Sequence, residues 1–281
     1  MSQQGVLVTG AAKGIGRACV ARLARTFRVY AGVRSAADGE SLVAELGSNV
    51  LPVVMDVTDQ ATIAAAAAII ADEQSRVPLR GVVNNAGIGV AGPLEFMPVS
   101  ELRHQLDVNV IGQLAVTQAL LPMLRVTKGR IINIGSIAGR SAMPMTGPYS
   151  ASKFALEALT DSLRIELIPA GVDVIIVEPG MIATPIWQTS IKAADKLMDT
   201  LPPEADKYYG RIIRGVRERA SSGDVKGLPP DSVARVVEEA LTTAKPKTRY
   251  VVGRDARMRL LLGMLPDRMR DRIIARRLAK M

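Results

Sequence analysis

Cysteine and histidine are almost absent from this sequence. Cys19 is the only cysteine and His104 the only histidine among 281 residues. A single cysteine excludes a disulfide framework and a thiolate metal site, and a single histidine excludes the usual catalytic dyads and zinc clusters. We therefore expect no metal site, and any acid–base chemistry must fall to Tyr, Lys, Asp or Glu. Cys19 itself is expected to pack on the apolar side of the first helix.

Aromatic residues are also scarce, at 3% of the chain, and the formal charge of +9 is gathered at one end. Residues 254–281 hold nine Lys or Arg against three Asp. Because the main body has no basic stripe with stacking aromatic rings, we expect no nucleic-acid partner. No uninterrupted apolar run of about 18 residues occurs, and the first strand begins at Gly5, so a cytoplasmic protein without a signal peptide is expected.

Short apolar segments alternate with helical patterns along the chain. This alternation predicts an α/β fold of the Rossmann type, with a doubly wound parallel β-sheet of about seven strands and helices on both faces. Ligands of such sheets bind at the carboxyl ends of the strands. The predicted strands are residues 5–9, 28–33, 50–55, 81–83, 130–134, 173–177 and 249–252, and the predicted helices include residues 17–26, 59–74, 101–124 and 149–167.

A glycine-rich turn joins the first strand to the first helix. Gly10, Gly14 and Gly16 have the spacing Gly-x3-Gly-x-Gly, which differs from the commoner Gly-x-Gly-x-x-Gly pattern of dinucleotide sites. A strand, a glycine turn and a helix amino end place backbone N–H groups and a positive dipole where a pyrophosphate can bind. An ordinary strand-to-helix turn is the alternative interpretation.

Two cations favour a phosphorylated dinucleotide. In a dinucleotide site the residue after the second strand faces the adenosine ribose, where an acidic residue selects NAD and an arginine pairs with the 2′-phosphate of NADP. Here that residue is Arg34, and Lys13 lies in the glycine turn nearby. We therefore expect NADP(H) as the preferred cofactor, with NAD(H) as the alternative. The other interpretation is that Arg34 and Lys13 are solvated surface charges with no role in cofactor binding.

Tyr149 and Lys153 form the central chemical motif. With Pro148 at the start of a helix, the two side chains lie one turn apart on the same face, which places an ammonium beside a phenol. A fixed positive charge favours the phenolate and moves the tyrosine pKa toward neutrality. Ser136 would add a hydroxyl for a substrate oxygen. Asn109 lies among apolar neighbours and is either a satisfied core amide or a relay.

Further motifs lie in order on the expected elements: Thr9-Gly10-x-x-x-Gly14-x-Gly16, Asp56-Val57, Asn84-Asn85-Ala86-Gly87, Asn109, Ser136, Tyr149-x-x-x-Lys153, and Pro179-Gly180 with Thr184. Together they resemble the short-chain dehydrogenase/reductase family over residues 6–253. Two stretches, residues 29–34 and 178–185, look most like the branch that contains 17β-hydroxysteroid and retinol dehydrogenases. That branch suggests an apolar substrate.

The resemblance implies a role for each motif residue. Tyr149 would be the proton donor or acceptor, and Ser136 would hold the reacting oxygen. Lys153 would lower the tyrosine pKa and bind the nicotinamide ribose, and Asn109 would anchor a water relay to Lys153. The expected cofactor-binding residues are Gly10, Lys13, Gly14, Ile15, Gly16, Arg34, Asp56, Val57, Asn84, Ala86, Gly87, Tyr149, Lys153, Pro179, Gly180, Ile182 and Thr184.

The expected activity is an NADP(H)-dependent oxidoreductase that interconverts a secondary or retinol-like alcohol and its carbonyl, on a steroid-, retinoid- or lipid-like substrate. An NAD-linked dehydrogenase with the same catalytic residues is the first alternative. A nucleotide-sensing scaffold without turnover is the second, although a pure binder does not need Ser136, Tyr149 and Lys153 together. Neither the substrate nor the direction of reaction follows from the sequence.

The predicted domain covers residues 1–253. Two segments, one inside this domain and one after it, leave the regular pattern. Residues 185–230 leave the strand–helix alternation and are expected to form a lid of short helices, with Trp187 and Tyr208 as substrate contacts; a packing excursion is the alternative. Residues 254–281 form a basic amphipathic helical tail, which would cover its own domain or a partner subunit, or make a peripheral membrane contact. The helices at residues 101–124 and 149–167 would bury apolar faces in a homodimer or homotetramer.

Overall fold

The computed structural model describes residues 3–278, apart from the side chains of residues 219, 222–225 and 277. Within these residues a seven-stranded sheet has the order β3-β2-β1-β4-β5-β6-β7, and every neighbouring pair of strands is parallel. The predicted parallel sheet is confirmed. The strands are β1 (Gly5–Val8), β2 (Arg28–Val33), β3 (Val50–Val54), β4 (Leu79–Asn84), β5 (Arg130–Ile134), β6 (Asp173–Pro179) and β7 (Arg249–Val252).

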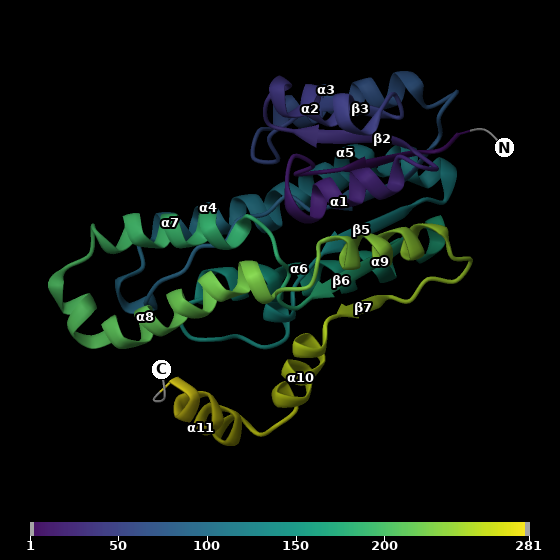
Figure 1. Ribbon diagram of the computed structural model, residues 1–281. Helices are drawn as coiled ribbons and strands as arrows, with labels where there is room; N and C mark the ends of the chain where they lie inside the picture. Colours follow the sequence, from purple (N-terminus) through teal and green to yellow (C-terminus); the bar gives the residue numbers. More distant parts are fainter. Residues whose placement is uncertain (1–2, 279–281) are drawn as a thin grey trace.

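Helices cover both faces of the sheet (Figure 1). One face carries α1 (Gly14–Leu23), α2 (Ala36–Leu46) and α9 (Asp231–Thr242), and the other carries α3 (Gln60–Glu73), α5 (Gly112–Thr127) and α6 (Gly147–Glu166). Because both faces are buried, the strands are apolar throughout rather than alternating in polarity. The sequence patterns had assigned neither α2 nor α9.

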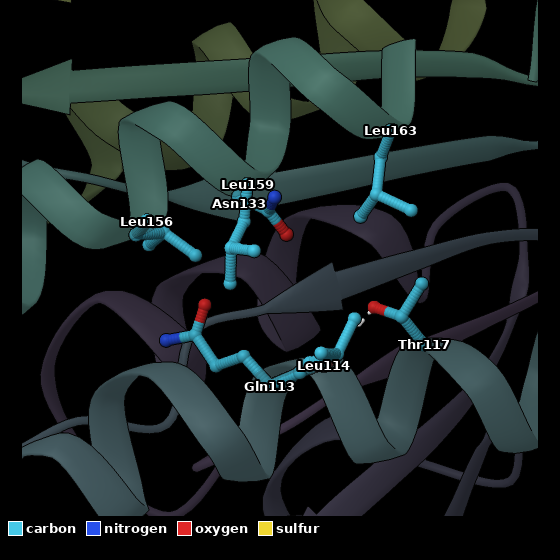
Figure 2. Close-up of a pocket in the computed structure, with 7 residues that line it drawn as sticks. All are labelled: Gln113, Leu114, Thr117, Asn133, Leu156, Leu159 and Leu163. Atoms are coloured by element: carbon cyan, nitrogen blue, oxygen red, sulfur yellow. Dashed lines mark hydrogen bonds between the residues drawn. The ribbon is translucent and has the colours of Figure 1, made fainter. Parts of the chain in front are cut away.

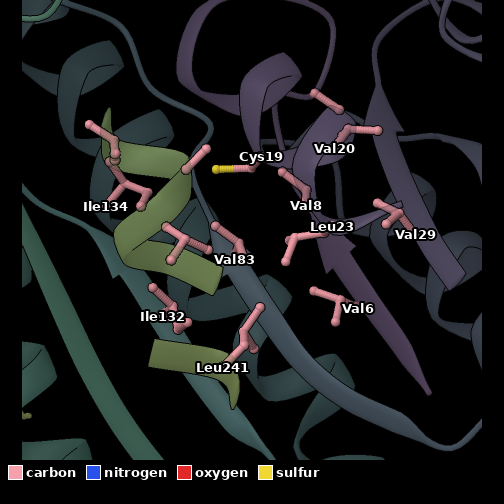
Figure 3. Close-up of a cluster of buried hydrophobic side chains, with 14 of the residues drawn as sticks. Val6, Val8, Cys19, Val20, Leu23, Val29, Val83, Ile132, Ile134 and Leu241 are labelled. Atoms are coloured by element: carbon pink, nitrogen blue, oxygen red, sulfur yellow. The ribbon is translucent and has the colours of Figure 1, made fainter. Parts of the chain in front are cut away.

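Successive side chains of a strand point to opposite faces, so each strand supplies two hydrophobic cores. In β1, Val6 and Val8 join the cluster around Cys19, and Leu7 joins the cluster on the other face (Figure 3). All of these side chains are at most 1% exposed. Burial raises the pKa of the Cys19 thiol to about 12, as fits a packing role.

The strand order reverses beside β1. The chain runs from β1 outward to β2 and β3 and then returns to place β4 on the other side of β1. The connections after β1 and β4 therefore diverge at their carboxyl ends, which opens a crevice where ligands bind in sheets of this type. The glycine turn follows β1 directly, so it lies at this crevice.

The helix predicted at residues 101–124 is built from three consecutive segments. These are α4 (Val99–Leu106), a π-helical turn (Asp107–Ile111) and α5. Among the described residues, the run Val99–Thr127 is the one long and apolar enough to cross a membrane by length and composition, and 39% of its most apolar window is buried. Its α5 part packs against β4 and α3, as core helices do.

Residues 183–228 form a closed excursion at one end of the molecule. It contains α7 (Ile186–Met198) and α8 (Pro203–Lys226), a helical hairpin whose second helix is longer than expected (Figure 1). At its base the Ala183 N–H donates to the Leu228 carbonyl over 2.9 Å, and the Leu228 N–H donates to the Met181 carbonyl over 2.9 Å. The hairpin thus leaves and rejoins the domain at one point, directly after β6.

The tail forms α10 (Arg254–Gly263) and α11 (Asp267–Leu278), with a break at Pro266 as the sequence suggested. The sequence predicted apolar side chains inside and arginines outside. In α11 Ile274 is buried as expected, at 7% exposure, but α10 departs from the prediction. Met258 and Leu261 are each 66% exposed, whereas Arg259 is partly buried and donates to the Ser141 carbonyl. Ala256 carries the buried contact instead. The side chain of residue 277 and residues 279–281 lie outside the described part of the tail.

Candidate active site

The carboxyl edge of the sheet gathers the polar residues that the sequence singled out. Gly10 follows β1, Arg34 follows β2, Asp56 follows β3, Ser136 follows β5 and Gly180 follows β6. All strands are parallel, so these residues meet at one edge although they span most of the chain.

The glycine turn has the shape that a phosphate cradle needs. Gly10 and Gly14 have φ angles of +62° and +55°, a region that residues with a Cβ rarely adopt. A Cβ on Gly16 would lie 2.2 Å from the Gly10 carbonyl oxygen and 2.6 Å from Asn85 Nδ2. In the described structure, Lys13 precedes α1 without a side-chain cap on the first turn. The first N–H groups of α1 are thus available for an anion.

Thr9 and Asn85 hold this turn against the end of β4. The Thr9 hydroxyl accepts from the N–H groups of Asn85 and Ala86, both over 2.9 Å, and Asn85 Nδ2 donates to the Thr9 and Gly10 carbonyls over 2.9 and 3.1 Å. Sequence reasoning gave Asn85 no role, although it stands in the quoted Asn-Asn-Ala-Gly motif. Asn84 is turned into the core, where its Nδ2 donates to Thr117 and Asn133. A cofactor contact from Asn84 would therefore come from its backbone.

A charged corner lies at the ends of β2 and β3. Two hydrogen bonds from Thr58, at 2.6 and 2.8 Å, hold the pKa of the Asp56 carboxyl below its ordinary value, and the Arg34 cation adds to this effect. Arg34 and Lys13 are both exposed. The corner therefore presents one accessible cation, Arg34, beside a carboxylate that Thr58 already engages, and Lys13 adds an exposed cation on the glycine turn.

Ser136, Tyr149 and Lys153 converge at the end of β5. Pro148 occupies the first turn of α6, as predicted, and the Lys153 Nζ lies 5.8 Å from the centre of the Tyr149 ring. The Ser136 hydroxyl accepts from the Ala138 N–H over 3.1 Å and is hydrogen-bonded to Tyr149. A phenol, a hydroxyl and an ammonium thus share one partly buried spot.

Burial controls the ionisation of these groups. It raises the pKa of Tyr149 above its ordinary value, although the bond to Ser136 and the positive charge of Arg259 act in the opposite direction. Burial also lowers the pKa of Lys153 to about 8, and the Glu157 charge offsets only part of that change. The sequence had assigned the cation that acts on Tyr149 to Lys153. Arg259 adds a positive charge that acts on this pKa in the same direction, and the effect expected from Lys153 stays a prediction.

Asn109 lies in the π-helical turn and ties the catalytic helix to the loop after β4. Its Oδ1 accepts from the Ile88 N–H over 2.9 Å, and its Nδ2 donates to the Ile88 carbonyl and to Ser152 Oγ, both over 3.0 Å. The side chain is fully buried. It is thus a satisfied core amide that positions the residue before Lys153, and the water relay from Asn109 to Lys153 stays a prediction.

The loop after β6 closes against the glycine turn. The distance from a Cβ on Gly14 to Thr184 Cβ would be 3.2 Å, and Thr184 is 6% exposed. A Cβ on Gly180 would lie 2.3 Å from Asp255, whose Oδ2 accepts from the Met181 N–H over 2.8 Å. The expected contacts from both loops therefore surround one crevice. Asp255 was missed, because nothing in the tail sequence ties it to this loop.

Comparison with known proteins agrees with this arrangement. The family model described as short chain dehydrogenase matches residues 4–195, which include the glycine turn and the Ser136, Tyr149 and Lys153 group. The protein belongs to the short-chain dehydrogenase family. The membership predicted from the motifs is thereby confirmed, and with it an NAD(P)-dependent oxidoreductase that acts on CH–OH groups.

Similar short-chain dehydrogenases include reductases and retinol enzymes. The chain is 40% identical to a 3-amino-tetrahydro-pyrrolizinone reductase of Xenorhabdus hominickii, with 92% of this chain and 89% of the relative covered. It is 36% identical to an NADPH-dependent 3-dehydrocapnine reductase of Ornithobacterium rhinotracheale, with 98% and 97% covered. Human retinol dehydrogenase 5 is 35% identical, with 96% and 87% covered.

Two solved short-chain dehydrogenases share the fold over nearly the whole chain. One from Streptomyces avermitilis has a TM-score of 0.78 at 29% identity and covers 97% of this chain and 95% of its own. One from Burkholderia cenocepacia, in complex with NADP, has a TM-score of 0.72 at 28% identity and covers 98% and 97%.

A buried carboxyl pair lies behind the catalytic lysine of this short-chain dehydrogenase. Glu157 and Glu178 are 6% and 0% exposed, and in the described structure one carboxylate oxygen of each has no hydrogen-bond partner. Arg249 Nη2 lies 3.1 Å from Glu157, and Arg249 Nε lies 3.4 Å from Glu178. Burial first, and then repulsion from Glu178, raises the pKa of Glu157 to about 7. Below about pH 7 Glu157 therefore keeps its proton, one helical turn from Lys153.

A small cavity of about 10 Å³ lies apart from these groups, between α5 and α6 (Figure 2). This volume is close to the minimum for one water molecule, so the cavity is no substrate site. It is lined by Gln113, Leu114, Thr117, Asn133, Leu156, Leu159 and Leu163.

The carboxyl pair predicts an unusual dependence of stability on pH. The pKa of Glu157 is about 7 in the folded chain against an ordinary value of 4.5. Between these values the folded chain holds a proton that the unfolded chain releases, so the free energy of unfolding falls as pH rises. Glu157→Gln removes this proton uptake. From pH 5 to pH 8 we expect the melting temperature of the wild type to fall by about 3 °C relative to Glu157→Gln in scanning calorimetry.

Asp161→Asn is the matched control, because Asp161 also contacts Arg249. Burial acts to raise its pKa, but Arg249 and Arg164 bring the pKa below the ordinary value. Asp161 is therefore ionised in both the folded and the unfolded chain between pH 5 and pH 8. The difference in melting temperature between Asp161→Asn and the wild type should stay constant over this range. If the difference in melting temperature between Glu157→Gln and the wild type also stayed constant, this would contradict the proton held by Glu157 in the folded chain.

Proposed function

We propose that this short-chain dehydrogenase interconverts a secondary or retinol-like alcohol and its carbonyl with NADP(H) as cofactor. The observation that carries the proposal is the convergence of Ser136, Tyr149 and Lys153 at the sheet edge that also holds the glycine turn. One crevice thus combines a proton-transferring phenol with a cradle for a dinucleotide.

The residues of the crevice fit the cofactor. The glycine turn shows this fit: because Gly16 has no Cβ, a phosphate can approach the backbone at Gly10, and a Cβ on Gly16 would occupy that space. Gly10, Gly14, Ile15 and Gly16 would receive the pyrophosphate on the first turn of α1. The remaining contacts would come from Lys13, Arg34, Asp56, Val57, Asn84, Ala86, Gly87, Tyr149, Lys153, Pro179, Gly180, Ile182 and Thr184. The bound nicotinamide supplies or accepts the hydride.

The chain itself handles the proton. In reduction Tyr149 Oη gives its proton to the substrate oxygen, and in oxidation it takes the proton of the alcohol. Ser136 donates a hydrogen bond to the same oxygen and fixes its position. Lys153 binds the ribose of the cofactor, and its ammonium donates to the Ile134 carbonyl over 2.8 Å, which fixes it in place. Asn109 holds the preceding residue, Ser152, by a hydrogen bond.

The cofactor preference rests on Arg34 and Lys13. Both are exposed at the corner where the adenosine ribose would lie, and the neighbouring Asp56 is engaged by Thr58. A phosphate is better matched to two cations than a ribose hydroxyl is. The printed names of the Ornithobacterium relative and of the Burkholderia cenocepacia structure, which mention NADPH and NADP, support the same preference. NAD(H) is the alternative cofactor.

An apolar substrate is supported by the retinol dehydrogenases among the relatives and by the hairpin of α7 and α8. We propose that this hairpin is the lid. Trp187 is partly buried at its start, and its Nε1 donates to the Ile182 carbonyl over 2.7 Å, beside Thr184. Tyr208 is 60% exposed, so its expected substrate contact finds no support in the geometry.

Exposed apolar residues support the proposed assembly of the protein into a homo-oligomer. Ile111, at the end of the π-helical turn before α5, is 56% exposed, and Phe154 and Ile165 on α6 are 46% and 64% exposed. These exposed apolar side chains support a homodimer or homotetramer that covers this surface. The outward Met258 and Leu261 of the basic tail would suit either a subunit contact or the surface of an anionic membrane. A cytoplasmic location, with or without that membrane contact, is part of the proposal.

Arg34→Ala tests the cofactor preference. Loss of a charge-assisted contact with the 2′-phosphate should raise the dissociation constant for NADPH at least about tenfold and leave that for NADH within about twofold. Parallel fluorescence titrations of both nucleotides measure these constants. Arg25→Ala, which removes an exposed cation at the far end of α1, should change neither. Equal losses for both nucleotides would refute the assignment of Arg34.

Tyr149→Phe tests the chemistry. It removes only the hydroxyl, so turnover of a ketone should fall about 1,000-fold or more while the dissociation constant for NADPH stays within about twofold. Tyr208→Phe removes an exposed hydroxyl and should retain full turnover. Retention of activity in Tyr149→Phe would exclude Tyr149 as the proton donor.

Trp187→Ala tests the lid. We expect KM for apolar ketones to rise about tenfold, with little change in the NADPH dissociation constant, because the ring anchors the hairpin and not the cofactor. Tyr208→Ala removes an exposed ring of the same hairpin and serves as the matched control. If KM and the NADPH dissociation constant of Trp187→Ala rose equally, the hairpin would be a packing element rather than a lid.

A further inference from the structure

Helix α7 of the hairpin packs against two glycines of the loop after β4. A Cβ on Gly92 would lie 3.4 Å from Leu197 Cδ2, and a Cβ on Gly89 would lie 2.8 Å from Ser190 Oγ. Leu197 and Ser190 are two turns apart on the same side of α7. The hairpin therefore lies directly on this loop, with an apolar contact at one glycine and a hydroxyl at the other.

Gly89 places the Ser190 hydroxyl beside the catalytic phenol. The same Cβ on Gly89 that would lie 2.8 Å from Ser190 Oγ would lie 3.9 Å from Tyr149 Cδ2. The hydroxyl and the ring thus flank one point, which no side chain fills. Unlike Gly10 and Gly14, Gly89 has no positive φ angle, so its backbone does not require glycine. What the glycine provides here is space next to Tyr149.

Ser190 brings an unpaired hydroxyl to this space. It is partly buried, as are Ile186 and Ala194 one turn to either side of it. In the described structure its hydroxyl has no hydrogen-bond partner, whereas the adjacent Thr189 hydroxyl, on the exposed side of α7, donates back to the Pro185 carbonyl over 3.0 Å. Polar groups that leave water are normally paired, so the space suits a molecule that supplies a partner.

Farther from the phenol the contacts between hairpin and loop become apolar. A Cβ on Gly92 would lie 2.9 Å from Met97 Cε as well as close to Leu197. The Phe96 ring meets the Tyr209 ring of α8 edge-on, with their centres 6.1 Å apart. A substrate bound between the hairpin and this loop would therefore meet a hydroxyl near its reacting carbon and apolar side chains beyond it.

We propose that Ser190 is a substrate-binding residue that selects ketones, and the corresponding alcohols, with a hydroxyl or amino group on the carbon next to the reacting one. This rests on the proposed function, and it narrows the apolar substrate to one with a polar group at the reacting end. A serine hydroxyl both donates and accepts, so it matches either group. Gly89 leaves the room in which that group meets Ser190.

Equilibrium binding tests the proposal without turnover. The full chain with Tyr149→Phe keeps the ring, and in the presence of NADP⁺ the fluorescence of Trp187, the only tryptophan and a neighbour of Ser190 on α7, reports ketone binding. The measured quantity is the dissociation constant of octan-2-one divided by that of 1-hydroxyoctan-2-one. Ser190→Ala should lower this ratio about fivefold, because one hydrogen bond is lost. Thr189→Val removes the adjacent outer hydroxyl and should keep the ratio of the parent chain.

Turnover with NADPH gives a second readout in chains that keep Tyr149. The value of kcat/KM for 1-hydroxyoctan-2-one, divided by that for octan-2-one, should also fall about fivefold in Ser190→Ala. Gly89→Ala places a methyl group in the same space and should lower this ratio too. Its combination with Ser190→Ala should lower the ratio little further, because both changes remove one contact.

The two readouts separate this proposal from the proposed function. Ratios in Ser190→Ala that equal those of its parent chain would overturn the role of Ser190, and so would an equal fall in Thr189→Val. If the wild type reduced neither ketone, the proposed function would fail. The binding ratios would then still decide whether Ser190 recognises the polar group.

Discussion

Loss of hydration at the carboxyl edge of the sheet is the constraint on which the active site depends. Burial raises the pKa values of Tyr149 and Glu157 and lowers that of Lys153, so it disfavours the charged form of each group. The fold compensates with groups that act at short range, such as the Ser136 hydroxyl and the Arg249 guanidinium. The charged form of each of these groups is therefore less stable than it would be in water, and hydrogen bonds and charges nearby decide how the groups ionise.

Most of the fold follows from patterns that are local in sequence. The apolar strands, the glycine turn after β1 and Pro148 at the start of α6 each depend on the chemistry of a few neighbouring residues. Parallel pairing then brings Gly10, Ser136 and Gly180 to one edge without further information. For the same reason the catalytic group could be predicted, because Tyr149 and Lys153 share one helix and Ser136 ends the strand before it.

The residues that were missed depend on contacts between distant parts of the chain. Asp255 meets Met181 across 74 residues, and Arg259 meets Ser141 across 118. The charge-rich tail pattern predicted solvated arginines, and it could not show which of them turns inward. Glu178 likewise read as the end of a strand, and its pairing with Glu157 appears only when β6 and α6 pack together.

The same contacts join three segments that are distant in sequence: the α7–α8 hairpin, helix α10 and the loop after β5. The base of the α7–α8 hairpin closes on Met181, and Asp255 of α10 binds the backbone of the same residue. Arg259, one turn later, binds the catalytic loop. A change in the tail that moved α10 would therefore disturb the base of the hairpin and the loop between Ser136 and Tyr149 together. The hairpin and the loop after β5 are thus linked through one short helix, although neither the hairpin nor the tail contains Ser136, Tyr149 or Lys153.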